Sequence, residues 1–426
     1  MPSSPVIFLS SGFLGPNRDG NQSITNTIIG FLESGYRVFH FSFVSERDSS
    51  FDFRRLKAFV NYHHFGFPGW VLAFFRRLNR LSIRNRPCRP VPADSESVDP
   101  GLTEITWKQN AAIVACTLAE FCRMAFASLI VRPGLFYGYE VSGIFAAYGL
   151  ARLTSKKCVT RFQGTYVTER NMHLPVMALH VAALRLKAHG LVINNDGTRG
   201  DVIAQRLGIA QERLFFRPNG LDDRLFEYRK NPEDNRVSMR AAINTSSSKF
   251  VAGVFTRFYP YKRVDQSLYL LERFLKKNIS LHLAIGGDGP LAGALRHLAG
   301  ERNIEKHVTW CGPLSYEEMP SYYTACDVVF HLNDYANINN QTLEAICLGI
   351  PLLAIDDGYN SKMFGDCPFA RFIQKEELET ISWEEIEKLI AKRGSPYSSP
   401  HIRSWKERMK EEIVWIEQLQ ERRGGT

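Results

Sequence analysis

The stretch "ITNTIIGFLESGYRVFHFSF" (residues 24–43) contains the pattern that decides the fold. Residues 24–35 have the apolar spacing of an amphipathic helix that is closed by Gly35, and residues 36–43 form a strand-like apolar run. A shorter apolar run, "VIFLS" (6–10), precedes them. Strand, helix and strand in this order predict a βαβ unit with a glycine-containing loop between the first strand and the helix.

The same alternation continues along the chain. Further strands are expected at residues 134–140, 156–164, 190–195 and 214–220, each separated from the next by a helical stretch. A polar, turn-rich segment at residues 229–249 interrupts the pattern and is the best candidate for a domain junction. Beyond it the alternation restarts, with strands expected at residues 250–256, 280–287, 307–312, 327–332 and 351–356.

The repeated pattern predicts an α/β fold with two tandem Rossmann-like domains, each a doubly wound parallel sheet, that face a central cleft. We assign residues 1–225 to an N-terminal Rossmann-like domain and residues 226–395 to a C-terminal Rossmann-like domain. Residues 396–426 are expected to form an amphipathic helix that packs back across the domains or against a partner helix. Its predicted buried side consists of Trp405, Met409, Ile413, Trp415 and Ile416.

Composition agrees with a folded protein of two domains. The chain has 426 residues, of which 44% are hydrophobic and 23% charged. Its eight cysteines have no regular spacing, which predicts buried free thiols in a reducing, cytoplasmic compartment. The N-terminus has no positively charged region before its apolar stretch, so a strand is expected there rather than a signal peptide. Residues 111–131 are long enough to span a bilayer, but Glu120 and Arg123 in their middle favour a buried or amphipathic helix.

The net charge of +9 is unevenly distributed. Residues 53–93 contain no acidic side chain, and their arginines and lysine alternate with aromatic residues. The segment is either a solvated helix face with ordinary core aromatics, or a contact with an anionic membrane surface that would make the protein a peripheral membrane protein. Nucleic acid is disfavoured as a partner because no recognised binding motif accompanies the charge.

Ligands bind at the carboxyl ends of the strands in such sheets, so polar and glycine residues in the loops there are the candidates for a ligand site. The first loop, "SSGFLGPNRDGNQS", carries Gly12, Gly15 and Gly20 before a helix start and is either a phosphate loop or a plain turn. Its spacing is not GxGxxG, which argues against a dinucleotide-dependent oxidoreductase in which Glu46 would bind a ribose.

Two loops of the second half carry more specific signals. "VFTRFYPYKRVDQSL" (254–268) places Arg257 and Lys262 at a strand's carboxyl end, where two cations suit a diphosphate leaving group, although a solvated basic loop has the same composition. "LAIGGDGPL" (283–291) brings Gly287 into a turn after the next strand. It is either a ligand loop or a tight connection.

The stretch "NDYANINNQTLEAICLGIP" (333–351) places asparagines before an apolar helix. Asn337, Asn339, Asn340 and Gln341 favour the amino end of a helix. Glu344 is expected in the first turn, where it either stabilises the helix dipole or accepts hydrogen bonds from a ribose diol.

Taken together, these residues resemble the retaining glycosyltransferases of GT-B architecture, specifically glycosyltransferase family 4. The resemblance runs from residue 6 to about residue 358. It is carried by "RPNGLDDRLF" (217–226), "VFTRFYPYKRVDQSL", "LAIGGDGPL", "VTWCGPLSYEEMPSYYTACDVVFHL" (308–332) and "TLEAICLGIPLLA" (342–354).

The resemblance implies that the N-terminal domain, residues 1–225, binds the acceptor and that the C-terminal domain, residues 226–395, binds the nucleotide-sugar. It also implies a role for each matching residue. Arg257 and Lys262 match the pair that clamps the donor diphosphate, and Glu344 matches the second glutamate of an E-x7-E element that binds the ribose hydroxyls. The nucleobase would be read by the loop of Gly312, Pro313 and Leu314, and the loop of Gly15 and Gly20 would face the phosphates. No metal and no cofactor are expected, since the nucleotide-sugar is a co-substrate and no DxD motif is present.

The resemblance therefore implies a retaining hexosyltransferase, which moves a hexose or N-acetylhexosamine from a UDP-sugar, or second a GDP-sugar, to an acceptor hydroxyl. The acceptor would be a glycan, a lipid-linked molecule or a small metabolite. Ala336 stands where the first glutamate of E-x7-E is expected, so Asp334, Asn337 or Asn339 would hold the sugar instead, or the protein would be a catalytically silent nucleotide- or glycan-binding module. In the first half, Glu140 either orients the acceptor hydroxyl or is structural. "RFQGTY" (161–166) has Gln163–Gly164 in place of the family's frequent His–Gly pair.

Overall fold

The computed structural model describes residues 5–11, 19–43, 53–66, 107–230, 236–243, 250–335 and 337–421, and these form two compact units. Unit 1 contains the described residues up to Gly220 together with those from Trp405 onward, and unit 2 is Leu221–Ser404. The polar segment 229–249, which we expected at the junction, falls within the sequence range of unit 2. Unit 2 begins after Gly220, whereas the sequence-based assignment ended the N-terminal domain at residue 225.

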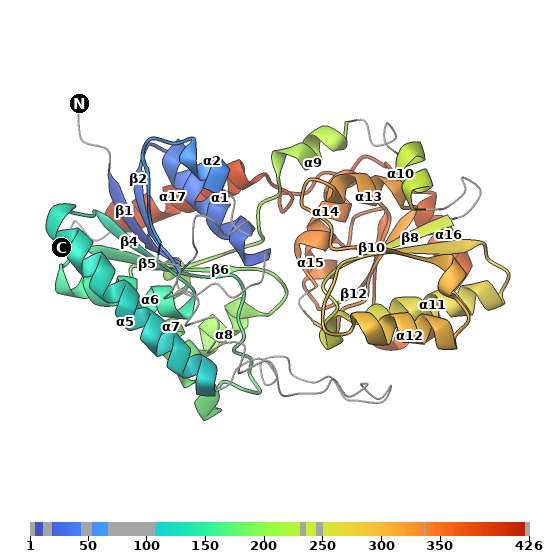
Figure 1. The fold of residues 1–426 in the computed structure, drawn as a ribbon, viewed down its shortest axis with the longest axis horizontal. Helices are drawn as coiled ribbons and strands as arrows, with labels where there is room; N and C mark the ends of the chain where they lie inside the picture. The colour runs from blue at the N-terminus through green and yellow to red at the C-terminus, as the bar shows by residue number, and fades with distance from the viewer. Residues whose placement is uncertain are drawn as a thin grey trace. The chain divides into compact units, whose positions relative to one another are not determined.

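Unit 1 is built on a seven-stranded sheet in the order β3-β2-β1-β4-β5-β6-β7, in which every pair is parallel (Figure 1). This confirms the predicted doubly wound parallel sheet. β3 was not foreseen from the sequence. The strands are β1 (Val6–Ser10), β2 (Arg37–Phe41), β3 (Tyr62–Phe65), β4 (Leu135–Tyr139), β5 (Lys157–Phe162), β6 (Gly190–Asn194) and β7 (Leu214–Arg217).

Helices cover both faces of this sheet, because alternate strand residues point to opposite sides. Ile7 and Leu9 of β1 pack with α1 and α17, whereas Phe8 packs with α5 and α6. The helices are α1 (Asp19–Glu33), α2 (Phe53–Lys57), α5 (Trp107–Ile130), α6 (Glu140–Leu153), η1 (Pro175–Met177), α7 (Ala178–Arg185), α8 (Gly200–Arg206), η2 (Gln211–Arg213) and α17 (Trp405–Glu421).

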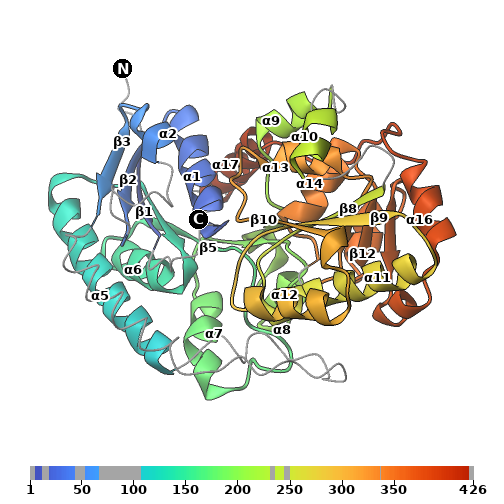
Figure 2. The same ribbon diagram turned by 45° about the vertical axis from the view of Figure 1, so that its right-hand side comes forward.

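Unit 2 contains a six-stranded parallel sheet in the order β10-β9-β8-β11-β12-β13 (Figure 2). Its chain order reverses between β8 and β11, and a parallel sheet of this kind binds ligands beside that switch point. The strands are β8 (Phe250–Phe255), β9 (Leu281–Gly286), β10 (Val308–Gly312), β11 (Val328–His331), β12 (Leu352–Ile355) and β13 (Ala370–Ile373).

The helices of unit 2 are amphipathic and bury their apolar sides on this sheet. In α11, for example, Val264, Leu268, Leu271 and Phe274 recur at helical spacing and join the core under β8 and β9. The elements are α9 (Asp223–Tyr228), α10 (Arg236–Ala242), η3 (Pro260–Lys262), α11 (Val264–Lys276), α12 (Ala292–Glu301), η4 (Glu305–His307), α13 (Met319–Ala325), α14 (Asn340–Leu348), α15 (Asn360–Phe364), η5 (Lys375–Glu379) and α16 (Trp383–Ile390).

The last helix, α17, returns to unit 1. Trp405, Met409, Ile413 and Ile416 are buried there, as the sequence predicted, and Trp415 packs against the same core. The periodicity did not reveal a buried ion cluster on the same helix. The Glu412 Oε2 atom lies 2.6 Å from Arg408 Nη1 and 3.1 Å from Arg161 Nη1, and the Tyr137 hydroxyl donates to Glu412 Oε1 at 2.5 Å.

Helix α5 corresponds to the long apolar segment of the sequence. The stretch Gln109–Ile130 is long and apolar enough to cross a membrane by length and composition. In the structure it packs beside α6, with Glu120 buried and hydrogen-bonded to the Ser10 hydroxyl. Arg123 donates to the backbone carbonyls of Ser42 and Gly66. Glu120 and Arg123 thus contact other parts of unit 1, as expected for an amphipathic helix that packs on a protein core.

Candidate functional site

The carboxyl end of β8 brings the two predicted phosphate-binding cations together. Arg257 is the second residue after the strand, and Lys262 ends the short helix η3. Tyr261 lies between them: Arg257 Nη2 donates to its hydroxyl at 3.4 Å, and the Lys262 Nζ atom lies 5.2 Å from its ring centroid. Lys262 is only 8% exposed, so its charge acts in a partly desolvated environment.

The next cation, Arg263, is held differently. Its backbone is left-handed (φ 47°), and its guanidinium pairs with Asp265 at 3.1 Å and Asp334 at 3.2 Å. Asp334 also pairs with Lys375 at 3.0 Å. The carboxylate that we considered as a replacement for the missing sugar-binding glutamate is therefore already engaged by two cations. Ala336 itself lies outside the described residues.

The asparagines of residues 333–351 do begin a helix, as predicted. Asn339 is the N-cap of α14, where its side chain accepts a hydrogen bond from the Thr342 backbone at 3.3 Å and donates to His331 Nε2 at 2.8 Å. Asn340 and Gln341 are the first two helical residues. The side chain of Asn337 reaches the Asn333 carbonyl at 3.4 Å. The amide groups of Asn337 and Asn339 thus shape the loop.

His331 links this helix start to Lys262. Burial, and after it the charge of Lys262, holds the pKa of His331 well below its ordinary value, so the imidazole is neutral. Its Nδ1 lies 2.6 Å from the Thr342 hydroxyl, which donates to the Asn337 carbonyl at 2.7 Å. The charge of Lys262, from the end of β8, thus acts on the residue that ends β11.

Buried polar groups at this sheet edge lack partners within the described part of the chain. The side-chain amide of Asn333, 1% exposed and just beyond β11, has neither its oxygen nor its nitrogen bonded, and the Thr256 hydroxyl after β8 is likewise without a partner. An unsatisfied buried polar group is costly, so such groups mark places for water or a ligand. Sequence reasoning missed both residues, because only the burial of their side chains distinguishes them.

The glycine turn after β9 makes a close backbone approach. A Cβ atom on Gly287 (φ 140°) would lie 1.9 Å from the Thr256 carbonyl oxygen, so only glycine fits there. The Gly287 N–H donates to the Gly312 carbonyl at 2.7 Å. Pro313 follows exposed, and Leu314 packs against Gly286. The turn thus joins the loops after β8, β9 and β10 into one edge.

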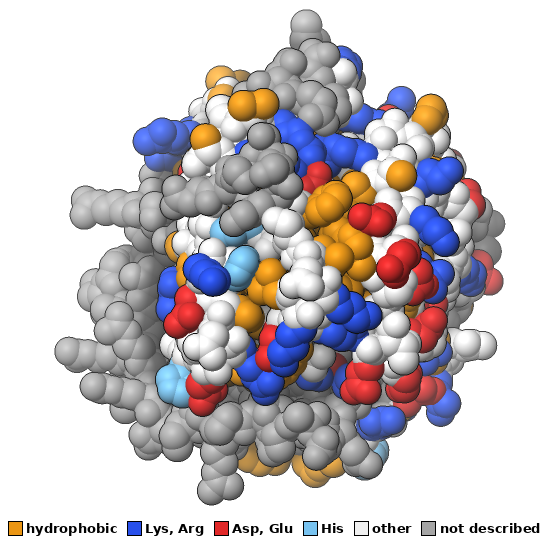
Figure 3. Space-filling model, turned by 90° about the vertical axis from the view of Figure 1, so that its right-hand side faces the viewer, with side chains coloured by type: hydrophobic (Ala, Val, Ile, Leu, Met, Phe, Trp, Pro, Cys, Tyr) orange, Lys and Arg blue, Asp and Glu red, His pale blue; other side chains and the backbone are white. Residues whose placement is uncertain are grey.

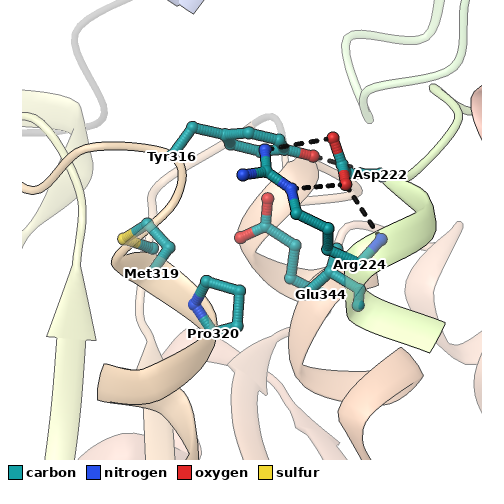
Figure 4. Close-up of a pocket in the computed structure, with 7 residues that line it drawn as sticks. Asp222, Arg224, Tyr316, Met319, Pro320 and Glu344 are labelled. Carbon is teal, nitrogen blue, oxygen red and sulfur yellow. Dashed lines mark hydrogen bonds and ion pairs between the residues drawn. The ribbon is translucent and has the colours of Figure 1, made fainter. Parts of the chain in front are cut away.

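Glu344 is the fifth residue of α14, so our placement of it in the first turn was wrong; the helix begins at Asn340. Its side chain, 4% exposed, lines a pocket (Figure 4). Burial and then the charge and hydrogen bond of Glu344 raise the pKa of Tyr323 well above its ordinary value. The other lining residues are Asp222, Arg224, Leu225, Tyr316, Met319 and Pro320.

Arg224 also lines this pocket, and its guanidinium lies beside Tyr316 and Asp222 (Figure 4). Its guanidinium stands 5.5 Å from the Tyr316 ring centroid and pairs with Asp222 at 2.9 Å. The Asp222 N–H in turn donates to the Tyr316 hydroxyl at 3.1 Å. None of the three was selected from the sequence, although "RPNGLDDRLF" and "CGPLSYEEMP" contain them, because their proximity to Glu344 depends on the fold.

In unit 1, Glu140 directly follows β4 and adopts a left-handed backbone (φ 56°), a strained conformation for a residue other than glycine. Its partly buried carboxylate accepts a hydrogen bond from the Gln163 N–H at 2.9 Å. Burial raises the pKa of Glu140 to about 7, against the lowering effects of this hydrogen bond and of Arg161. Gly20 is the second residue of α1, and Gly15 lies outside the described residues.

The raised pKa of Glu140 predicts a pH-dependent effect of Glu140→Gln on stability. Because the folded-state pKa of about 7 exceeds the ordinary 4.5, folding favours the protonated form, and this contribution is lost as pH rises from about 4.5 to about 7. Glutamine cannot ionise. The melting temperature of the variant should therefore rise relative to wild type between these two pH values. Glu212→Gln, an exposed control in η2, should show no such trend; a pH-independent difference for Glu140→Gln would contradict the assignment.

Known proteins are similar to this chain in fold, and a known family matches most of the sequence of unit 2. Residues 235–403 match the family of glycosyl transferases group 1. The chain is 26% identical over 187 residues to the putative glycosyltransferase EpsF of Bacillus subtilis, which covers 44% of this chain and 47% of EpsF. It is 23% identical over 174 residues to alpha-monoglucosyldiacylglycerol synthase of Streptococcus pneumoniae, covering 41% of this chain and 39% of that protein. The match thus spans less than half the length of both relatives.

The fold is similar over the whole chain to a solved structure. HepE of Anabaena, in complex with UDP and glucose, superposes with a TM-score of 0.65 at 14% sequence identity, covering 96% of this chain and 99% of HepE. The predicted GT-B architecture is thereby confirmed, and the resemblance to group 1 glycosyl transferases is confirmed for residues 235–403, without distinguishing family 4.

Proposed function

Since its second unit carries the group 1 glycosyl transferase match, we propose that this protein is a glycosyltransferase that uses a nucleotide diphosphate sugar. The observation that carries the proposal is that Arg257, Lys262 and the amino end of α14 lie beside the switch point between β8 and β11. Glu344 is on the same helix, α14. We favour UDP over GDP as the nucleotide and a hexose or N-acetylhexosamine as the sugar. HepE, of similar fold, was solved with UDP and glucose.

Each residue has a stated role in this proposal. Departure of the nucleoside diphosphate develops negative charge on phosphate oxygens, and preorganised cations and helix N–H groups stabilise such charge. Lys262, Arg257 and the N–H groups at the start of α14 supply this stabilisation, and they take the place that a divalent metal has in other transferases. Glu344 accepts the ribose hydroxyls. The departing phosphate oxygen removes the acceptor's proton on the same face, which retains the anomeric configuration.

One alternative is a protein that binds nucleotides or glycans without turnover. It is favoured by the engagement of Asp334 with Arg263 and Lys375 and by the use of Asn339 as a helix cap, which leaves both side chains occupied near the expected sugar site. An assay of sugar transfer and donor hydrolysis with purified protein distinguishes the two. Nucleotide binding without any turnover of UDP- or GDP-sugars would favour the alternative.

Nucleotide binding is tested directly by thermal unfolding. A nucleotide that binds only the folded state stabilises it by about 2.7 kcal/mol at a concentration of 100 Kd. We expect UDP or UDP-sugar to raise the melting temperature more than GDP or ADP, and Glu344→Gln to weaken the binding of all of them about tenfold, because a charge-assisted hydrogen bond to the ribose becomes a neutral one.

The control for this experiment is Glu387→Gln, an exposed glutamate of α16. It should respond to nucleotide as wild type does. If no nucleotide stabilises the wild type, the proposed donor site is wrong; if Glu344→Gln binds as tightly as wild type, the role of Glu344 is wrong.

For the acceptor, we propose a lipid-linked molecule or glycan, and a cytoplasmic protein that works at a membrane surface. One relative is named as a synthase of a glycosylated diacylglycerol, and the basic segment of residues 53–93 suits such a surface. Only residues 53–66 of that segment are described. There, Arg54, Arg55 and Lys57 of α2 are exposed while Phe53 and Leu56 are buried. A small soluble acceptor is the competing assignment.

A further inference from the structure

Helix α5 has its polarity reversed relative to an ordinary surface helix. Nine of its described side chains are exposed, and all nine are apolar: Trp107, Ala111, Val114, Ala115, Leu118, Cys122, Phe126, Leu129 and Ile130. They recur every three or four residues, so they form one continuous face, which we call the outer face of α5. A helix of 24 residues extends about 36 Å, so this face is long as well as apolar.

Two polar residues of α5, Asn110 and Glu120, lie buried on the opposite side. Glu120 is buried against the Ser10 hydroxyl, and Asn110 donates to the Val176 carbonyl at 2.9 Å. Figures 1 and 2 show α5 along the outside of unit 1, with α6 between it and the sheet. A different face, shown in Figure 3, has acidic and basic side chains around its apolar ones. A contiguous apolar face of this kind marks an interaction site.

The outer face does not mark a membrane-spanning helix. Cys116, Glu120, Met124 and Ala127 are buried on the inner side, where Met124 and Ala127 join the core over Phe8 and Phe136. A spanning orientation would expose this core and the Glu120 carboxyl to lipid, which is costly. Only 22% of the apolar stretch within Gln109–Ile130 is buried in the protein. The helix is therefore suited to lie in the plane of a membrane surface, with its inner side on the protein.

Cations lie at one end of the outer face. Leu135 pairs with Lys157 across β4 and β5, so the loops that precede these strands lie at the same edge of the sheet. Three exposed cations lie there: Arg132 in the loop before β4, and Arg152 and Lys156 near the loop before β5. None of the three pairs with a carboxylate among the described residues. Beside them, Leu129, Ile130 and Leu153 are 81%, 78% and 75% exposed. Exposed apolar side chains next to unpaired cations are the combination that binds the headgroup region of an anionic bilayer.

We propose that the outer face of α5 inserts into the interfacial region of an anionic membrane, with Arg132, Arg152 and Lys156 binding lipid phosphates at its end. This surface is distinct from residues 53–93, and the inference does not rest on the proposed sugar transfer. A second copy of the chain is a poorer occupant, because no described acidic side chain is exposed on α5 to meet the cations.

The test is vesicle co-sedimentation of the full chain, with phosphatidylcholine vesicles and with phosphatidylcholine–phosphatidylglycerol vesicles. Wild type should bind the anionic vesicles more strongly. Leu129→Ser/Ile130→Ser should weaken that binding at least about tenfold, from the apolar surface it removes. The matched control, Val237→Ser/Val414→Ser, removes two exposed apolar side chains of α10 and α17 and should bind as wild type does.

A second variant pair separates charge from hydrophobicity. Replacing Arg132, Arg152 and Lys156 by glutamine should lower the preference for anionic vesicles by about fivefold per cation and make binding less sensitive to salt. The control replaces Lys277, Lys388 and Lys392, three exposed lysines of unit 2, by glutamine and changes the net charge equally. Melting temperatures of all variants should match wild type, since every replaced side chain is exposed.

A fluorophore locates the contact. Cys122 lies on the outer face, so an environment-sensitive label on Cys122, with Cys88 and Cys311 replaced by serine, should shift to the blue when anionic vesicles are added. The proposal fails if wild type does not bind anionic vesicles, if Leu129→Ser/Ile130→Ser binds them as wild type does, or if the label does not shift. A concentration-dependent dimer that Leu129→Ser/Ile130→Ser abolishes, without vesicle binding, would assign the outer face to a protein interface instead.

Discussion

Replacing Lys262 with methionine is expected to lower kcat for sugar transfer by about 10²–10³-fold, the effect of removing one preorganised group that stabilises developing charge. Lys262 is 8% exposed and lies near His331 at the switch point between β8 and β11, where its charge is only partly screened by water. The affinity for the donor should fall less than kcat, because the charge on the leaving diphosphate is greatest in the transition state. Steady-state kinetics with the preferred nucleotide-sugar measures both quantities.

The matched control is Lys276→Met, which removes one exposed lysine at the end of α11. Its kcat should remain within about twofold of wild type, since the cation is solvated and forms a surface pair with Glu272. Thermal unfolding of Lys262→Met shows whether unit 2 is intact. A folded Lys262→Met protein with wild-type kcat would rule out a role for this lysine in leaving-group departure.

Replacing Glu412 with glutamine is expected to destabilise unit 1 by about 3–5 kcal/mol, the usual cost of removing one partner of a buried ion pair. Glu412 is the carboxylate that both Arg161 and Arg408 contact, and all three side chains are almost wholly buried. Without it, two guanidinium groups remain desolvated within a few ångströms of each other. Chemical denaturation followed by circular dichroism measures the loss.

Two further variants make the interpretation specific. Glu421→Gln, at an exposed position of the same helix, should change the free energy of unfolding by less than about 0.5 kcal/mol. The triple variant Arg161→Met/Arg408→Met/Glu412→Leu should recover most of the loss, because well-packed apolar side chains replace a buried ion cluster at little cost. A Glu412→Gln protein as stable as wild type would show that the cluster is not maintained in solution.

The strands were predictable because each is a short apolar run that ends in a turn. Residues 6–10, 190–195 and 250–256 coincide within a residue with β1, β6 and β8. β3 was missed because "YHHF" has two adjacent histidines between aromatic residues and no buried apolar run, and β13 because "ARFI" is short and interrupted by an arginine. Such edge strands are recognised by their neighbours, Phe41 beside Phe65 and Leu353 beside Arg371, rather than by their own residues.

The candidate site was predictable where a residue's chemistry is local. Arg257 and Lys262 follow β8 in the sequence, and Asn339 caps the helix that follows β11. The local sequence was therefore enough to place each of them. Asn333, Arg224 and Tyr316 depend on contacts between distant segments, which no periodicity encodes. The burial of Arg161 and Glu412, 251 residues apart, is invisible in the sequence for the same reason.

The position of α17 has a consequence for biosynthesis. Unit 1 is assembled from segments on both sides of unit 2, and its buried Arg161 acquires the Glu412 carboxylate only from a helix that is translated after Ser404. On the ribosome, therefore, the nascent first unit carries an uncompensated guanidinium in its core while the described part of unit 2, the continuous segment Leu221–Ser404, is able to fold. Order of folding would then run against order of synthesis, and nascent chains stalled before residue 405 should bind chaperones through the uncovered apolar surface of α1.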